Sequence, residues 1–274
     1  GRPVPLWWDI PLYVQAAIID TDELEEFDYN ECINENPKVE DKTIFNKILD
    51  KIVLAKRPVI LAGSGIRLGD CHKQFIEMIE KLNIPVVTAW NAHDLLWDEH
   101  RLYCGRPVTI GTRGGNFVVQ NSDLLRSFVS RLKIRQISYN WQKFANKAYK
   151  IVIDIDEAEL KKPTLNIDMP IHANVKDVIE GIIATKTELH NEEHEAWLKW
   201  CKEVNKRYPV VQERYFNKLT PVNPYVFFKK MSECLEKDEV IITAPGTASY
   251  CSFQALTIKR GQRLFTNSGC FSMG

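Results

Sequence analysis

The chain has 274 residues, with 36 lysines and arginines against 36 aspartates and glutamates, and 45% of its residues are hydrophobic. The net charge of zero provides no overall field for nucleic acid or a membrane surface, so neither is expected as a partner. Its seven cysteines are scattered and form no Cys-x-x-Cys pair. They indicate reduced thiols in a cytoplasmic protein rather than a disulfide framework or a zinc site.

The first part of the chain is polar. Residues 20–41 are rich in aspartate and glutamate, which predicts a solvated linker. A helix is expected from about Thr43 to Lys56, directly before a short apolar run.

The stretch 57–69 carries the strongest local pattern. Its run Pro58–Ala62 is fully apolar, which is typical of a strand buried on both faces of a parallel sheet. Gly63, Gly65 and Gly69 follow, and then an amphipathic segment from Asp70 to Leu82. A strand, a glycine turn and a helix can bind a phosphate, because glycine permits close approach and the first helical N–H groups point at the anion. The spacing is one residue longer than the usual dinucleotide fingerprint, so a glycine turn without a ligand explains it equally well.

Further strands and helices alternate over about 140 residues, which predicts a doubly wound α/β domain with a parallel sheet. Strands are expected at 84–89, 124–130, 150–156 and 170–174, and a helix at 175–184. Arg126 interrupts the apolar run at 124–130. The glycine-rich residues 103–116 are expected to be too flexible to belong to the core.

A charged helix is expected from about 190 to 208, with Trp197 and Trp200 on one stripe that we interpret as packing. His190 and His194 stand four residues apart on this helix, where a solvated surface is favoured over a metal site. Asn223 precedes Pro224, a pair that is typical of a helix start.

Residues 239–267 contain two apolar runs around a turn and a helix, which predicts the beginning of a second α/β domain. The chain begins at Gly1, and its last residues introduce a helix that does not follow. We therefore expect a piece of a longer polypeptide.

Several stretches together resemble the thiamine-diphosphate-dependent enzymes related to acetolactate synthase. Residues 8–15, Trp-Asp-Ile-Pro-Leu-Tyr-Val-Gln, resemble the D-I-P-x-D-V-Q exit from the family's pyrimidine-binding domain, with Tyr13 where an acid is common. Residues from about 46 to 185 resemble its central domain. Residues 261–274, with the pattern G-Q-R-x-x-x-N-S-G-x-x-S-M-G, resemble the start of its diphosphate-binding domain.

The resemblance implies a division of the chain into four parts. Residues 1–41 would form the exit from an N-terminal domain that is missing here, together with a linker. Residues 42–186 would form the Rossmann-like central domain, 187–220 a helical linker, and 221–274 the truncated start of the thiamine-diphosphate-binding domain.

In this family the central domain either binds FAD, largely as a structural cofactor, or keeps the fold without it. The residues that would contact FAD here are Gly63, Ser64, Gly65, Gly111, Thr112, Arg113, Arg131, Asp154, Asp156 and Asn174. Arginine can pair with a pyrophosphate as a fork, and acids at strand ends can accept hydrogen bonds from ribose. In the alternative interpretation, Arg113 and Arg131 form surface ion pairs and Asp154 caps a turn.

The resemblance also implies residues that contact thiamine diphosphate. Its diphosphate would meet Gly246, Thr247, Ala248 and Ser249, which lie between a predicted strand and a predicted helix. Pro245 stands where an acid or glycine is expected and removes one N–H donor. Gly269, Ser272 and Met273 align with the segment that supports the aminopyrimidine.

The implied parent enzyme uses thiamine diphosphate and Mg²⁺ to decarboxylate a 2-keto acid such as pyruvate. It then transfers the two-carbon unit to a keto acid or a keto-sugar. The catalytic glutamate would lie upstream of Gly1 and the metal motif downstream of Gly274. We therefore expect no catalytic residue and no metal ligand in this chain, and no activity of the chain alone.

The family's active site lies between two chains, so self-association into a dimer or tetramer is expected. One alternative is a non-catalytic scaffold that binds FAD or another nucleotide. A second is an NAD-dependent oxidoreductase, which would need an acid at the end of the second strand, where residues 88–90 offer none.

Overall fold

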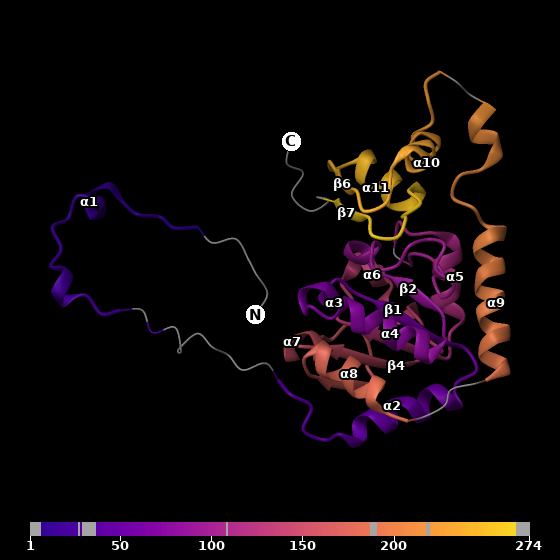
Figure 1. Cartoon of the computed structure of the whole chain (residues 1–274), viewed down its shortest axis with the longest axis horizontal. Helices are drawn as coiled ribbons and strands as arrows, with labels where there is room; N and C mark the ends of the chain where they lie inside the picture. The colour runs from indigo at the N-terminus through magenta and orange to yellow at the C-terminus, as the bar shows by residue number, and fades with distance from the viewer. Residues whose placement is uncertain are drawn as a thin grey trace.

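The computed structural model describes residues 7–26, 28, 37–107, 109–186, 191–217 and 220–266. Its centre is a five-stranded sheet in the order β2-β1-β3-β4-β5 (Figure 1). The strands are β1 (Pro58–Ala62), β2 (Val86–Thr88), β3 (Leu124–Phe128), β4 (Tyr149–Asp154) and β5 (Met169–His172). Every neighbouring pair is parallel. The prediction of a doubly wound α/β fold is therefore confirmed.

Helices cover the sheet in two groups. The helices of this unit are α2 (Thr43–Leu54), α3 (Gly65–Leu68), α4 (His72–Leu82), α5 (Arg113–Asn121), α6 (Ile134–Ile137), α7 (Glu157–Leu160) and α8 (Val175–Ala184). Helix α8 packs against α2 and α4, whereas α5 packs against the later helix α9 (Glu192–Arg207). The strand order reverses between β1 and β3, and right-handed crossovers then place helices on opposite faces.

Burial on both faces explains the apolar runs of the central strands. All five residues of β1 are buried, and so are all five of β3. Arg126, which interrupts the apolar run, lies within β3 with 0% exposure, so the predicted strand continues through it.

Residues 102–107 correct the expectation that this stretch is flexible, because they belong to the core. Leu102 and Cys104 are at most 1% exposed. The Val86 N–H donates to the Leu102 carbonyl at 2.8 Å, and the Cys104 N–H donates to the Val86 carbonyl at 2.7 Å. The segment thus extends the sheet beside β2, which a reading of its composition does not show.

Asparagine side chains begin three of the long helices. Asn174 accepts a hydrogen bond from the N–H of Lys176 at the start of α8. Asn191 and Asn223 make the equivalent bonds at α9 and at α10 (Pro224–Cys234). These bonds satisfy N–H groups that have no partner within the helix, and so fix where each helix begins.

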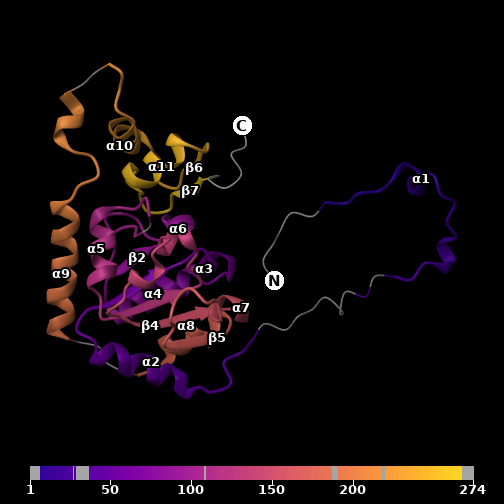
Figure 2. The ribbon, with the colours of Figure 1, turned by 180° about the vertical axis from the view of Figure 1, so that it is seen from behind.

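Helix α9 runs along the side of the central unit from the α2 end toward the C-terminal part (Figures 1 and 2). Trp197 is buried, its indole N–H donates to the Pro58 carbonyl at 3.1 Å, and its ring stacks on Trp200. The packing interpretation of this stripe is confirmed. The solvated placement of His194 is wrong, because its ring is 2% exposed and its Nε2 lies 2.7 Å from the Ala55 carbonyl oxygen. His190 lies outside the described residues.

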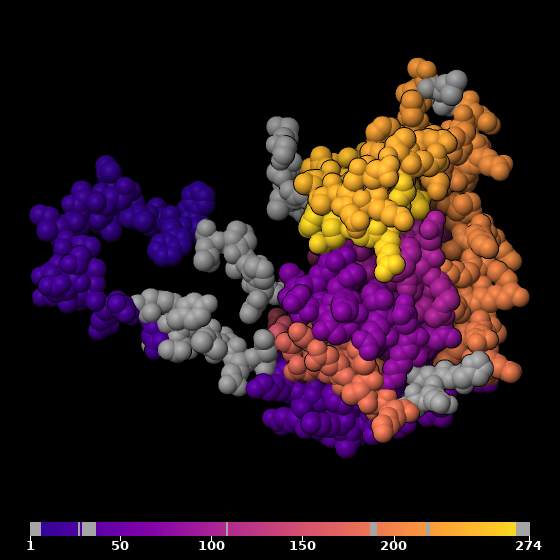
Figure 3. Space-filling model, in the orientation of Figure 1, coloured from indigo at the N-terminus to yellow at the C-terminus, as the bar shows by residue number. Residues whose placement is uncertain are grey.

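A second, smaller unit follows α10. It contains β6 (Val240–Thr243), α11 (Thr247–Ala255) and β7 (Arg263–Thr266), and its two strands are parallel. Helix α11 begins at Thr247, immediately after Gly246. Figure 3 shows this unit seated directly on the central body.

The N-terminal residues 7–26 lie apart from both units (Figures 1 and 2), and every one of them is exposed. They include α1 (Leu12–Gln15), and the side chains of Trp7 and Trp8 are 92% and 80% exposed. In the part of the chain that the structure describes, no helix is long and apolar enough to cross a bilayer.

Candidate functional site

A cavity of about 200 Å³ lies at the carboxyl ends of β1, β2 and β3. Ser64 and Gly65 reach it from the turn after β1, and Trp90 and Asn91 from the segment after β2. Open α/β sheets bind ligands outside the carboxyl ends of their strands, where the strand order reverses. The cavity occupies that position between β1 and β3.

The cavity has a cationic wall. Arg131, Lys133 and Arg135 come from the segment after β3, and no carboxylate is among the described residues that line it. Burial, together with the neighbouring charges of Arg131 and Arg135, lowers the pKa of Lys133. Arg131 is held by Glu159, with its Nε 2.8 Å from Oε1. An anionic group with several oxygens would offset the repulsion among these cations.

The first glycine turn is filled mostly by the protein itself. A Cβ atom at Gly63 would lie 2.3 Å from the carbonyl oxygen of Val129. A Cβ atom at Gly65 would lie 2.5 Å from the Cβ of Val129. Gly63 does not line the cavity, whereas Ser64 and Gly65 do. For Gly63, the structure therefore fits the alternative that this glycine serves the packing of the turn and does not contact a ligand.

The loop Gly111–Arg113 has protein partners and does not line the cavity. Thr112 caps α5, since its Oγ1 accepts from the Gly115 N–H at 3.2 Å. The Gly111 carbonyl accepts from the side-chain amide of Gln254 in α11 at 3.3 Å. The Arg113 guanidinium lies over the ring of Tyr208, 4.6 Å from its centroid.

The polar residues after β4 and β5 satisfy nearby backbone N–H groups. Asp154 is buried, and its Oδ1 accepts from the N–H of Asp156 at 3.1 Å. Asp156 caps α7 by accepting from the Ala158 N–H at 3.0 Å, and Asn174 caps α8. The alternative that Asp154 caps a turn and Arg131 forms an ion pair matches these contacts.

The second glycine turn is open. Gly246 has φ +78°, and a Cβ atom built on it would meet nothing within 4 Å. The N-cap of α11 is Gly246, which has no side chain to cap the helix, so among the described residues the N–H groups of Thr247 and Ala248 point out of its first turn. Ser249 is turned back, with its hydroxyl donating to the Gly246 carbonyl at 3.0 Å. Gly269, Ser272 and Met273 lie outside the described residues.

Among the lining residues that reasoning from the sequence did not assign to a site are Trp90, Asn91, Lys133 and Arg135. A usable signal exists in the sequence. Each of these residues lies shortly after a predicted strand, and the carboxyl ends of parallel strands share one edge of the sheet.

The fold and the cavity define a doubly wound α/β domain with an anion-suited cavity at its switch point. Residues 45–182 match the family described as thiamine pyrophosphate enzyme, central domain, and the chain belongs to this family. The resemblance inferred from the sequence is thus confirmed.

Relatives extend the likeness beyond the central domain. The chain is 32% identical over 212 residues to the probable acetolactate synthase large subunit of Methanococcus aeolicus, covering 75% of this chain and 35% of that protein. It is 27% identical over 285 residues to the Methanocaldococcus jannaschii counterpart, covering 100% and 47%. It is 26% identical over 285 residues to the acetolactate synthase isozyme 1 large subunit of Escherichia coli, covering 100% and 46%. The chain thus spans at most about half the length of these curated relatives.

Proposed function

We propose that the chain is part of a thiamine-diphosphate-dependent enzyme of the acetolactate synthase type. The enzyme would decarboxylate a 2-keto acid such as pyruvate and transfer the two-carbon unit to a keto acid or keto-sugar acceptor. The observation that carries this proposal is the open, uncapped start of α11, which follows a central domain of the thiamine pyrophosphate family. The names of the relatives favour an enzyme over a non-catalytic scaffold.

The proposed diphosphate site consists of Gly246 and the first turn of α11. The empty space beside Gly246 suits an anion, and the N-terminus of a nine-residue helix attracts negative charge. When bound, thiamine diphosphate would supply the electron sink for decarboxylation. The chain's own residues would bind and orient the diphosphate, with Mg²⁺ as its counter-ion. Gly269, Ser272 and Met273 remain proposed supports of the aminopyrimidine.

We propose that the cavity between β1 and β3 holds the pyrophosphate of FAD. Its cationic wall of Arg131, Lys133 and Arg135 supports an anionic ligand. Its volume of about 200 Å³ is below that of usual ligand pockets, so it suits the pyrophosphate rather than a whole flavin. The other proposed contacts from Gly111 to Asn174 have protein partners, which they would have to exchange for FAD.

The proposed domain division follows from the same family. Residues 42–186 would form the central domain, 187–220 a helical linker, and 221–274 the start of the cofactor domain. Exposed Trp7 and Trp8 support a place for residues 1–41 against another part of the enzyme. We also propose a dimer or tetramer, and a cytoplasmic location, which the five free cysteines among the described residues support.

The test uses the full-length polypeptide. Purified protein is assayed for pyruvate decarboxylation with and without thiamine diphosphate and Mg²⁺, and its absorption spectrum is recorded. We expect decarboxylation that requires both additions, and flavin bands in the absorption spectrum. Absence of decarboxylation in their presence would contradict the proposed enzyme, whereas absence of flavin bands would contradict only the proposed FAD site.

A further inference from the structure

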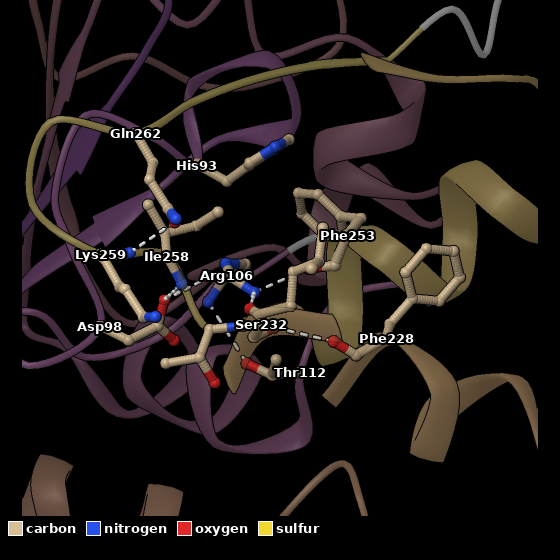
Figure 4. Close-up of polar contacts among 12 residues, drawn as sticks. His93, Asp98, Arg106, Thr112, Phe228, Ser232, Phe253, Ile258, Lys259 and Gln262 are labelled. Carbon is tan, nitrogen blue, oxygen red and sulfur yellow. Dashed lines mark hydrogen bonds and ion pairs between the residues drawn. The ribbon is translucent and has the colours of Figure 1, made fainter. Parts of the chain in front are cut away.

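Arg106 of the central unit reaches the carboxyl end of α11 in the second unit (Figure 4). Its side chain is 2% exposed. One guanidinium nitrogen, Nη1, donates to the Phe253 carbonyl at 2.8 Å and to the Leu256 carbonyl at 3.1 Å. The last carbonyls of a helix have no partner within it, and a cation there interacts favourably with the helix dipole. Arg106 therefore satisfies the Phe253 carbonyl in the last turn of α11 and the Leu256 carbonyl directly after the helix.

Asp98 completes this contact from the same loop of the central unit. Its Oδ2 accepts from Nη2 of Arg106 at 2.8 Å and from the Ile258 N–H at 2.7 Å. The Asp98 N–H in turn donates to the Ile258 carbonyl at 3.0 Å. Burial lowers the pKa of Arg106, but the Asp98 carboxylate and the Tyr103 hydroxyl outweigh it, so the net pKa is raised and the arginine stays charged.

A second carboxylate holds the chain beyond this point. Asp94 is buried, and its Oδ2 accepts from Nε of Arg263 at 2.6 Å and from the Leu264 N–H at 3.3 Å. Asp94 and Asp98 thus fix the start of β7 and the end of α11 to one loop. Phe253 also packs on Trp90, with ring centroids 4.2 Å apart.

These contacts affect the proposed diphosphate site because a helix is rigid, so fixing one end of α11 also fixes the location of its other end. Helix α11 has nine residues, so its two ends are roughly 13 Å apart. Fixing the Phe253 and Leu256 carbonyls fixes the axis of α11, and hence the place of Gly246 at its other end. A buried ion pair adds little net stability, because desolvation offsets its attraction. Its directional hydrogen bonds nevertheless hold one arrangement of the two units.

We infer that Arg106, oriented by Asp98, is a positioning residue for thiamine diphosphate, acting from the far end of the helix that would bind the diphosphate. This inference rests on the proposed function. Arg106 itself would touch neither the cofactor nor the substrate.

The variant R106M in the full-length polypeptide tests this role, with thiamine diphosphate and Mg²⁺ titrated calorimetrically. The dissociation constant for thiamine diphosphate should rise about tenfold or more, because the helix loses its fixed axis. The kcat at saturating cofactor should stay within about twofold of wild type, because no catalytic contact is removed. R106K, which keeps the charge without the fork, should show an intermediate rise.

The matched control is R126M. Arg126 is equally buried, and its guanidinium nitrogens have no hydrogen-bond partner among the residues that the structure describes. R126M removes a buried arginine from β3 of the same unit, where its guanidinium makes no hydrogen bond to α11 among the described residues, and should leave the dissociation constant unchanged. If R106M does not fold, the same titration is made on D98N, which weakens the ion pair that orients Arg106.

The outcomes separate the inference from the proposed function. A wild-type dissociation constant in R106M or D98N, even with lowered stability, would overturn the positioning role and leave the proposed function intact. A wild-type polypeptide that binds no thiamine diphosphate would overturn both. A rise in the dissociation constant of R126M as large as that of R106M would show a general packing effect, and would also overturn the positioning role.

Discussion

The two glycine turns look alike in sequence, yet the structure uses them in opposite ways. After β1, the backbone of Val129 occupies the space that a side chain at Gly63 would need. After β6, Gly246 has open space where a side chain would stand, and a φ of +78°. The first glycine is required for packing and the second for backbone conformation and access. A strand, glycine and helix pattern therefore does not by itself locate a phosphate.

The two sheets that carry these turns also differ, because the first is buried on both faces and the second is exposed on one. Strand β1 is buried at all five positions, as in a parallel sheet covered on both faces. In the second sheet, Ile241 and Leu264 are buried while Ile242 is 79% and Phe265 47% exposed. Parallel sheets are normally covered on both faces, so we expect a further layer to lie on this exposed face. The second unit thus depends on its neighbours more than the first does.

The largest expected effect is that of Gly63→Ala. The added methyl would overlap backbone atoms of Val129 and Ser130, at 2.3 and 2.5 Å, which cannot move without shifting the loop after β3. The free energy of unfolding should fall by about 3 kcal/mol, measured by urea denaturation of the full-length polypeptide.

A pair of variants separates backbone from side-chain overlap at this turn. G65A places its methyl against the Cβ and Cγ2 of Val129, so adding V129G should restore much of the stability. Adding V129G to G63A should restore less than it does for G65A, because the overlapping atoms there are backbone and the relief of strain at Val129, which has φ +45°, is common to both pairs. Equal rescue of both would contradict the distinction drawn for the first turn.

A second prediction concerns pH and the joint between the units. His93 is 1% exposed, its ring packs edge-on against Phe253 of α11, and burial lowers its pKa from 6.5 to about 4. Between these two pH values His93 is protonated in the unfolded chain but not in the folded chain. The free energy of unfolding therefore decreases as the pH falls from 6.5 toward 4. From pH 7 to pH 5 this group should cost about 2 kcal/mol of unfolding free energy.

Urea denaturation at the two pH values, with H93Q beside wild type, measures this contribution. H93Q should lose less stability than wild type on acidification. A residual loss is expected from His72 and His100, whose pKa values burial also lowers. An identical loss in both proteins would show that His93 does not take up the proton on unfolding.

At the second turn, Gly246→Ala should have a smaller effect on stability. Space is available for the methyl group, so only the backbone conformation at φ +78° opposes it. The free energy of unfolding should fall by about 1–2 kcal/mol, below the effect of G63A, because φ +78° with ψ −142° is a conformation that essentially only glycine adopts. Calorimetric titration should also show weaker binding of thiamine diphosphate, because the distorted turn moves the first N–H groups of α11. A loss of stability equal to that of G63A would remove the contrast between the turns.

Sequence reasoning succeeded where local patterns decide the structure. The apolar run Pro58–Ala62 became β1, and Asn223 caps a helix as its position before Pro224 indicates. It failed where distant contacts decide. The burial of Arg106 depends on Asp98 and on two carbonyls about 150 residues later, which no local spacing records.

The candidate site shows the same limit. Ser64 and Gly65 belong to a recognisable turn, and Arg131 to the resemblance. Trp90 joins them only because β2 lies beside β1 in the sheet. Strand order is a tertiary property, so residues that follow different strands meet at the cavity without a shared motif.

The smallest predicted effect concerns Arg113, which the resemblance implies as a contact to FAD. Its guanidinium lies over the Tyr208 ring at 4.6 Å, and it does not line the cavity. R113A should therefore lower stability by only about 0.5 kcal/mol, the size of an exposed cation–π contact. Flavin titration of the full-length polypeptide should give the wild-type dissociation constant for R113A and a raised one for K133A, which alters the cavity wall. Weaker flavin binding in R113A would mean that this arginine leaves Tyr208 for the ligand, and that the loop after residue 110 belongs to the first site after all.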